Sequence, residues 1–271
     1  MTEREVLRGR RTEVVTLAGP DATSLLSTQV SQGIQGLEVG EATWSLVLEP
    51  DGSLGHWVRV ARAGSDRWCV VGAQGRASAL LERLSRFRLR EKADLLVETM
   101  AIVVLDAGED VAGIELPAIW AGQGEREILV EDVEAMAEPR GVEELEARRI
   151  IAGRLSPDDL TEGDNPFAIG SAAVAASTSF TKGCYTGQEL VARMDARGAA
   201  APKRLVIGAS SGGLRPGMAL LSDGKEVGVV RSSADGRTAV CLVARAVPTP
   251  SSEAVSCGSE WVALVDPHGG S

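Results

Sequence analysis

Apolar residues in the first half of the chain predict several β-strands. Runs that are apolar and rich in β-branched residues fall at 14–19, 42–49, 54–62, 67–72 and 93–106. Pro-Asp-Gly at 50–52 predicts a hairpin turn between the second and third runs. Segment 128–133 predicts one further strand, at a sheet edge. Strands grouped around helices favour an α+β architecture over a parallel sheet.

Helical spacing of apolar residues marks three other segments. In 20–30, an apolar face is formed by Ala22, Leu25, Leu26 and Val30. Segments 75–89 and 141–153 show the same spacing, and Gly153 suits a helix C-terminal cap. The stretch 155–170 is rich in Pro, Gly and Asp and is predicted to be a loop, and 171–181 is small and weakly patterned.

The pattern changes near residue 199. Short apolar runs, KRLVIGA, GMALLSD, KEVGVVRSS and RTAVCLVA, follow one another at about ten-residue spacing with Gly-Asp turns between them. Short strands at this regular spacing predict a small antiparallel barrel or sandwich. The preceding RGAAAPK, residues 197–203, is predicted to be the linker between the two parts of the chain.

Composition and charge narrow the class of protein. The 271 residues are 44% hydrophobic and 24% charged, which suits two or three globular domains. The net charge of −10 argues against direct nucleic-acid binding. No apolar run reaches the roughly 18 residues of a membrane helix, and the charged N-terminus does not resemble a signal peptide. We expect a cytoplasmic protein with no membrane partner. The acidic run 125–146 is predicted to be a solvated face.

Cysteine and histidine do not form a metal-binding pattern. The four cysteines are far apart, and neither histidine completes a zinc motif, so no metal site is predicted. Three of the cysteines, Cys69, Cys241 and Cys257, are predicted to be packing residues. Predicted strands also carry Trp44, Trp57 and Trp68, which we expect in the core. His56 is either structural or faces a pocket.

The richest candidate chemistry is the stretch KGCYTGQE at 182–189, followed by Arg193. Lysine and arginine suit an anion, glutamine and glutamate suit a planar polar group, and tyrosine suits a pocket wall. The residues concerned are Lys182, Cys184, Tyr185, Gln188, Glu189 and Arg193. A nearby lysine, or the start of a helix over 187–194, favours a thiolate. The alternative is a tight structural loop entering a helix, with a surface ion pair.

KGCYTGQE, with the LVAR that follows, resembles the signature of the YgfZ family of folate-binding proteins. These proteins are relatives of the glycine-cleavage T-protein, an aminomethyltransferase, and support iron–sulfur cluster assembly or repair. AGPDATSLLSTQVSQGI, SLVLEPDGSLGHWVRV and EARRIIAGRLSPDDLTEGDNPFAIG resemble other family segments in the same order. The likeness is weakest over 63–140.

The resemblance implies a three-part ring. A discontinuous folate-binding domain would comprise 1–46 and 141–198, an inserted ferredoxin-like α+β domain 47–140, and a small antiparallel β-barrel 199–271. Tetrahydrofolate or a related reduced folate would bind near the centre. Carried over to this chain, Lys182, Cys184, Gln188, Glu189 and Arg193 line or support that site. The resemblance also implies that Cys184 is the functional thiol, which would react, ligate a transient cluster or only shape the pocket.

The function that the resemblance implies is that of an accessory protein for iron–sulfur enzymes or their assembly proteins. The alternatives are a folate-dependent one-carbon transferase, a factor for tRNA modification, and an interaction ring with a vestigial pocket. The hairpin in which the T-protein carries its catalytic aspartate has no carboxylate here, at 52–60. This departure counts against transferase activity, because proton management at the folate amine needs a carboxylate. Whether the protein is an enzyme is therefore left open.

Overall fold

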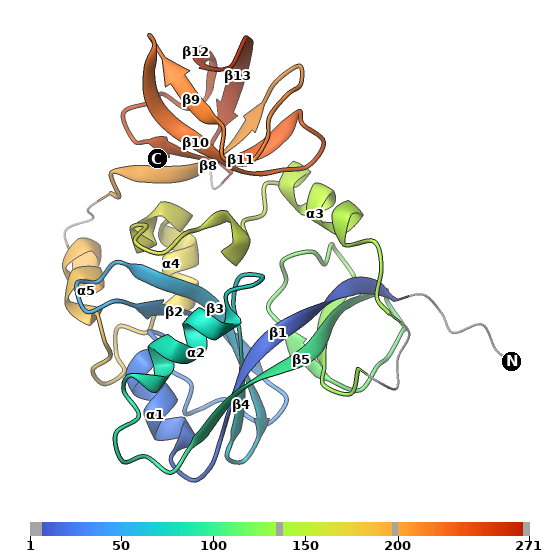
Figure 1. The fold of residues 1–271 in the computed structure, drawn as a ribbon, viewed down its shortest axis with the longest axis vertical. Coiled ribbons are helices and arrows are strands. Elements are labelled where there is room, and N and C mark those ends of the chain that lie inside the picture. The colour runs from blue at the N-terminus through green and yellow to red at the C-terminus, as the bar shows by residue number, and fades with distance from the viewer. Residues whose placement is uncertain (1–6, 134–137, 197–199, 268–271) are drawn as a thin grey trace, which may run out of the picture.

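The structure is a computed structural model and describes residues 7–133, 138–196 and 200–267. A seven-stranded sheet lies at one end and a closed six-stranded barrel at the other (Figure 1). The predicted combination of helices, antiparallel sheet and a small C-terminal barrel is confirmed.

The seven-stranded sheet has the order β2-β3-β4-β1-β5-β7-β6, with every neighbouring pair antiparallel. The predicted hairpin is present, with Ser45 opposite Val58 and Leu46 opposite Trp57. The strands are β1 (Arg8–Ala18), β2 (Ala42–Leu48), β3 (Leu54–Gly64), β4 (Arg67–Val71), β5 (Asp94–Leu105), β6 (Ile114–Leu116) and β7 (Arg126–Val130). One sheet thus spans residues 8–130, and the domain boundaries given above stay predictions.

Two strands differ from the prediction. Segment 128–133 was expected at an edge, but β7 lies between β5 and β6, and β6 is the edge strand. Three residues are too few for an alternating pattern, so β6 left no signal in the sequence. The first strand begins at Arg8, within a charged run, because β1 pairs with β5 along its whole length, from Arg8 opposite Val104 to Ala18 opposite Asp94.

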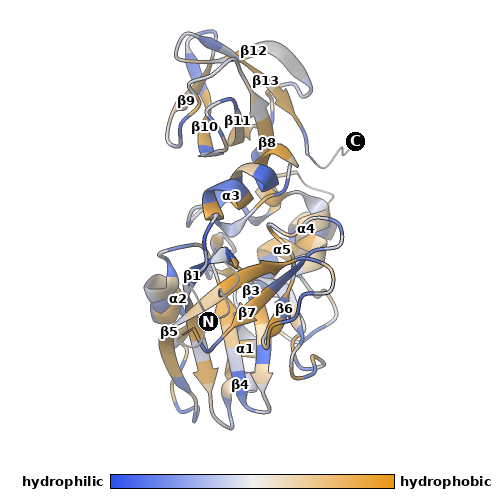
Figure 2. Cartoon of the chain, turned by 90° about the vertical axis from the view of Figure 1, so that its right-hand side faces the viewer, coloured by the Kyte–Doolittle hydropathy of each residue, from blue (hydrophilic) through white to orange (hydrophobic). Residues whose placement is uncertain are grey.

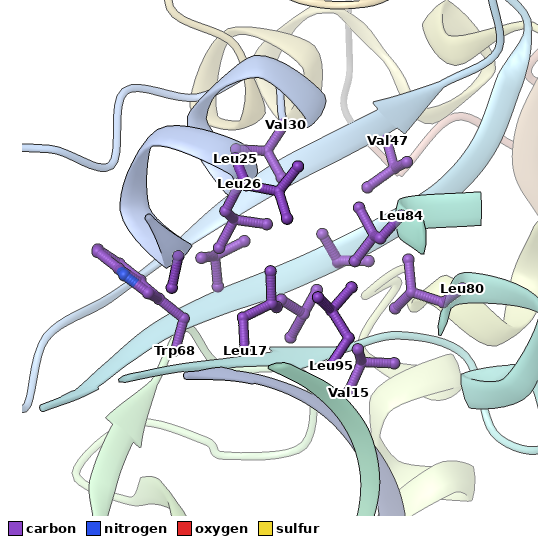
Figure 3. Close-up of a cluster of buried hydrophobic side chains, with 14 of the residues drawn as sticks. Val15, Leu17, Leu25, Leu26, Val30, Val47, Trp68, Leu80, Leu84 and Leu95 are labelled. Atoms are coloured by element: carbon purple, nitrogen blue, oxygen red, sulfur yellow. The ribbon is translucent and has the colours of Figure 1, made fainter. Parts of the chain in front are cut away.

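Two helices, α1 (Ala22–Gln29) and α2 (Ala77–Ser85), cover one face of the sheet. Their apolar sides meet strand residues in a single buried cluster (Figure 3). Leu25 and Leu26 of α1 and Leu80 and Leu84 of α2 pack there against Leu17 of β1. The helical periodicity of 20–30 and 75–89 therefore identified the core-facing sides correctly.

The opposite face of the sheet holds a buried ion pair. Glu127 on β7 is 0% exposed, and Arg59 on β3 donates to it through Nη1 at 2.6 Å. The other carboxylate oxygen accepts backbone N–H bonds from Ile119, Trp120 and Ala121. The prediction that 125–146 is a solvated acidic face is wrong at this position. The backbone N–H groups of the loop 119–121 bond to this carboxylate instead of to a neighbouring strand. The alternation of residues along β7 gives no sign of that contact.

The elements between sheet and barrel are short. They are α3 (Val142–Ile151), the 3₁₀ turns η1 (Pro157–Asp159) and η2 (Pro166–Ile169), α4 (Ser171–Ser177) and α5 (Gln188–Ala196). The predicted loop 155–170 thus contains two helical turns, and 171–181 begins as a helix. In Figure 2, α3 lies between the barrel and the sheet. Arg149 of α3 and Asp159 of η1 form a fully buried pair, and Ser232 of β10 donates to Asp159 at 2.5 Å.

The barrel closes in the order β10-β11-β8-β13-β12-β9. Its strands are β8 (Lys203–Ala209), β9 (Ala219–Ser222), β10 (Lys225–Ser233), β11 (Thr238–Ala244), β12 (Ser251–Cys257) and β13 (Glu260–Val265). Leu205 and Leu242 pair across β8 and β11 and pack toward η2 and the sheet. Within the described residues, no helix has the length and apolar character needed to span a membrane.

Candidate functional site

The signature segment connects α4 to α5 and lies against the end of α1. Ser179 N donates to Ser31 O at 3.0 Å, and Thr186 N donates to Thr28 O at 3.2 Å. These bonds bring a segment from the middle of the chain against the N-terminal helix. The signature loop is thus fixed by backbone bonds at both ends.

Lys182 points into this junction. Its Nζ donates to the carbonyl oxygens of Ser27 and Val30, both at 2.7 Å, and of Gln32 at 3.1 Å. The ammonium also lies 5.4 Å from the centroid of the Tyr185 ring. Burial lowers the pKa of Lys182 to about 8. All three ammonium protons serve the fold, and a role for Lys182 toward an anion stays a prediction.

Two glycines lock the signature onto the β2–β3 hairpin. Gly187 has a φ of +78°, and a Cβ there would lie 2.6 Å from both Glu49 O and Leu48 Cβ. Gly52, in the Pro-Asp-Gly turn, has a φ of +84°, and a Cβ there would lie 2.3 Å from Leu190 Cβ. Only glycine combines positive φ with such close contact. The KGCYTGQE signature and the Pro-Asp-Gly turn, both found in the sequence, therefore pack against each other.

A buried arginine that the sequence did not single out completes this contact. Arg83 Nε donates to Glu49 Oε1 at 2.8 Å, and Nη1 donates to Gln29 Oε1 at 3.2 Å. Its Nη2 donates to Leu48 O. Thr186 Oγ1 donates to the same Gln29 oxygen at 3.5 Å. The available signal was the position of Arg83 on the core-facing side of α2, between Leu80 and Leu84.

The structure divides the predicted site residues into two groups. Tyr185 is buried, and its N–H donates to Gln188 Oε1 at 3.2 Å, so these two stabilise the turn into α5. Cys184, Glu189 and Arg193 are exposed. Cys184 is a free thiol, whereas burial raises the pKa of Cys69 and Cys241 to about 12, which fits their predicted packing role. The six candidates do not converge on one enclosed pocket, and their ligand roles stay predictions.

A cleft of about 470 Å³, here called the barrel cleft, lies beside the signature helix. Leu190 of α5, Asn165 before η2 and Lys203 of β8 contribute to its wall. Its other lining residues are Asp51, Ser53, Gly163, Asp164, Ala168, Pro202 and Leu242. The cleft therefore joins the hairpin turn, the signature helix and the barrel.

A smaller cleft of about 220 Å³ lies at β3 and is called the His56 cleft. It is lined by Leu54, Gly55, His56, Trp57, Ala73, Gln74, Arg76, Pro157, Asp158, Leu160, Thr161 and Glu162. Burial, together with the positive charge of Arg76, lowers the pKa of His56 to about 4, so its imidazole is neutral at pH 7. Of the two interpretations of His56, the structure favours the one that faces a pocket.

Carboxylates reach this cleft from outside the hairpin. Asp158 accepts from Gln74 N at 2.7 Å and pairs with Arg10 at 3.3 Å. Glu162 pairs with Arg76 at 2.9 Å. Sequence analysis of the hairpin alone missed both, because they come from the loop around η1, about a hundred residues later. Among the residues that the structure describes, no group of three His, Cys, Asp or Glu side chains could hold a metal ion.

Comparison with known proteins identifies the architecture. A crystal structure of the glycine cleavage system aminomethyltransferase T from Bartonella henselae superposes with a TM-score of 0.70. The match covers 96% of this chain and 86% of that chain at 17% sequence identity. The chain has the fold of aminomethyltransferase T.

The other comparisons say less about the protein than this structural match does. No protein-family model matches the chain. An uncharacterized protein of Haemophilus influenzae is 27% identical over 190 residues, which is 69% of this chain and 67% of that protein. The T-protein-like architecture accommodates both clefts: the barrel cleft between sheet, signature helix and barrel, and the His56 cleft on the hairpin strand.

Proposed function

We propose that the protein binds a reduced folate and supports the assembly or repair of iron–sulfur enzymes, as the YgfZ family does. The observation that carries this proposal is the T-protein-like fold over 96% of the chain. The signature at 182–189 directs it to the YgfZ branch of that fold. In this proposal the three-part ring, with a folate domain at 1–46 and 141–198, an insertion at 47–140 and the barrel at 199–271, surrounds the ligand.

The barrel cleft is the proposed folate site. Its volume lies within the range of about 300–1,000 Å³ typical of small-molecule sites. Leu190, Leu242 and Pro202 offer apolar contact to a ring system. Asn165 Nδ2 makes only a long 3.6 Å contact to Met194 Sδ, so it keeps donor capacity for a pterin carbonyl. The exposed Lys203 suits the glutamate carboxylates of a folate.

Cys184 is the proposed functional thiol. Its exposure lets a client iron–sulfur enzyme or assembly protein reach it, unlike the three buried cysteines. We expect Cys184→Ala to lower the activity of iron–sulfur enzymes in the host. Cys257→Ala, which removes a buried thiol from the barrel, is the matched control. Unchanged iron–sulfur enzyme activity in a Cys184→Ala strain would contradict this role.

A one-carbon transferase is the second candidate, favoured by the same fold. The hairpin lacks a carboxylate, and Asp158 and Glu162 are each paired with an arginine. Sustained methylene transfer to tetrahydrofolate in a purified assay would establish the transferase instead. A direct role in tRNA modification is disfavoured by the charge of −10; an indirect one would act through iron–sulfur enzymes that modify tRNA.

Folate binding is tested by thermal stability. A ligand present at 100 times its dissociation constant stabilises the folded state by about 2.7 kcal/mol. We therefore expect tetrahydrofolate and 5-formyltetrahydrofolate to raise the melting temperature. Leu190→Glu places a charge in the barrel cleft and should abolish the shift, whereas Ala192→Glu, at an exposed position of the same helix, should not. No shift with wild type at millimolar folate would overturn the proposal.

A further inference from the structure

We infer that Arg83 is a positioning residue for the signature loop, residues 182–187. Arg83 acts through the last residues of α1 and the start of the hairpin turn, which are the two surfaces that the loop meets after Cys184. This inference deepens the proposed function and rests on it in one respect, because it takes Cys184 as the functional thiol.

Arg83 lies on α2 and joins segments that are distant from it in sequence. Its side chain is only 4% exposed. Nε donates to Glu49 Oε1 at 2.8 Å, Nη1 donates to Gln29 Oε1 at 3.2 Å, and Nη2 donates to Leu48 O. A guanidinium is planar and rigid, so it holds its partners in one fixed geometry. One side chain therefore fixes the end of α1 relative to the end of β2.

The first surface is the end of α1, which Thr186 contacts twice. Thr186 N donates to Thr28 O at 3.2 Å, and its hydroxyl donates to Gln29 Oε1 at 3.5 Å. Gln29 is 3% exposed, and its Nε2 donates to Thr28 Oγ1 at 2.9 Å. Because arginine has no acceptor atom, the Gln29 amide must turn its oxygen toward Arg83. Arg83 thereby sets the orientation of the amide that Thr186 contacts.

The second surface is the start of the hairpin turn, on which Gly187 rests. A Cβ at Gly187 would lie 2.6 Å from both Glu49 O and Leu48 Cβ. Arg83 binds these same two residues, Glu49 through its carboxylate and Leu48 through its carbonyl. Gly52 N also donates to Glu49 O at 2.8 Å, so the turn closes on a residue that Arg83 holds.

The exposed Cys184 lies between the two anchored ends of the loop. Lys182 anchors the loop before the thiol, by donating to three carbonyls at the end of α1. After the thiol, Tyr185 is buried among apolar side chains, and the next two residues rest on the surfaces that Arg83 holds. Apolar packing is non-directional, so the hydrogen-bonded contacts set the course of the backbone. The position of Cys184 thus depends on Arg83 from one side.

The first test is hydrogen exchange of backbone amides, followed by nuclear magnetic resonance. In Arg83→Met, we expect the acceleration of exchange at the Thr186 amide to exceed that of the β11 amides in the barrel at least tenfold. Arg83→Lys keeps a cation beside Glu49 but loses the fork, so it should recover part of the protection. Arg86→Met, at an arginine that follows α2 and is 59% exposed, is the control and should leave Thr186 unchanged.

Gln29→Met tests the route through α1. It removes the amide that Arg83 and Thr186 share and keeps an unbranched side chain. We expect it to accelerate exchange at Thr186, and the double variant to show less than the product of the two single effects, because both changes break the same bond. The inference is overturned if Thr186 and β11 accelerate equally in Arg83→Met, which is a loss of global stability alone, or if the single effects multiply.

The second test is iron–sulfur enzyme activity in the host, compared at equal amounts of soluble protein. Arg83→Met should lower this activity as Cys184→Ala does, Arg83→Lys should restore part of it, and Arg86→Met should not change it. Gln29→Met replaces Arg83→Met if the latter does not accumulate. Normal activity with Cys184→Ala would overturn the proposed function. A loss with Cys184→Ala but none with Arg83→Met or its replacement would overturn the positioning role alone.

Discussion

Lys182 stabilises the end of a helix by occupying carbonyl groups that no backbone amide reaches. A helix leaves its last carbonyls without intrahelical partners, and a cation there also meets the negative end of the helix dipole. Lys182 meets both needs at the end of α1. A lysine two residues from a cysteine suggested activation of the thiol, yet the ammonium of Lys182 donates to the carbonyls of Ser27, Val30 and Gln32.

The first prediction concerns Lys182→Met. The variant keeps the aliphatic stem but leaves buried carbonyls unpaired, and each such loss costs about 1–3 kcal/mol. We expect the free energy of unfolding in urea to fall by at least that amount. Lys225→Met, at an exposed lysine on β10, serves as the control and should be neutral. Equal midpoints for both variants would contradict the structural role of Lys182.

The second prediction concerns the pH dependence of stability. Because the pKa of His56 falls from 6.5 to about 4 on folding, the unfolded chain binds a proton first as the pH drops. Stability is therefore unaffected by His56 above pH 6.5 and declines between pH 6.5 and 4, by about 3 kcal/mol in total.

His56→Gln should remove this slope. Chemical denaturation of wild type and variant at several pH values measures the difference, which isolates His56 from the carboxylates that titrate in both proteins. Parallel stability curves would show that His56 is accessible enough to titrate normally.

At the scale of elements, the signature and the hairpin stabilise each other through glycine contacts. Neither stretch alone reveals this, because Pro-Asp-Gly reads as an ordinary turn and KGCYTGQE as a loop. Only the packed structure shows that Gly187 and Gly52 have positive φ angles and that a Cβ at either position would clash with its neighbours.

The third prediction compares two glycines of the signature. Gly187→Ala introduces a Cβ against Glu49 O and Leu48 Cβ at positive φ, and we expect a loss of about 2–4 kcal/mol. Gly183→Ala meets nothing within 4 Å and needs no positive φ, so it should be neutral. Thermal unfolding of both variants measures this contrast. A neutral Gly187→Ala would mean that α5 shifts freely away from the hairpin.

An element could be predicted from the sequence when its own residues carry a periodic pattern of apolar positions. The hairpin, the amphipathic helices and the barrel strands carry local periodicity, and their place in sequence was predictable. β6 is too short for a pattern, and the first residues of β1 are strand only because β5 lies beside them. In the site, the position of Cys184 on the surface, the buried Arg83 and the approach of Asp158 to His56 all depend on contacts between distant segments.

At the scale of the whole molecule, a buried ionic joint connects the barrel to the rest of the chain. Arg149 donates to both oxygens of Asp159, at 2.9 and 3.1 Å, and Ser232 of the barrel donates to the same carboxylate. Removing one member of a buried pair costs about 3–5 kcal/mol, and without Asp159 the buried Arg149 would keep only the partly exposed Glu146, at 2.7 Å.

The fourth prediction follows from this joint. Asp159→Asn should lower the free energy of unfolding by about 3–5 kcal/mol, whereas Ser232→Ala should cost about 1 kcal/mol. Calorimetry distinguishes loss of overall stability from separate melting of the barrel. A single, unshifted transition for Asp159→Asn would contradict the role of the joint.

The bonds of Lys182 also set a time scale for synthesis of the protein. Ser27 lies 155 residues before Lys182. At translation rates of about 5–20 residues per second, α1 leaves the ribosome roughly 8–30 s before the lysine that completes it. During this interval its apolar side and its open carbonyl end depend on other partners, so nascent chains halted before residue 182 should be recognised by chaperones more strongly than those halted after it.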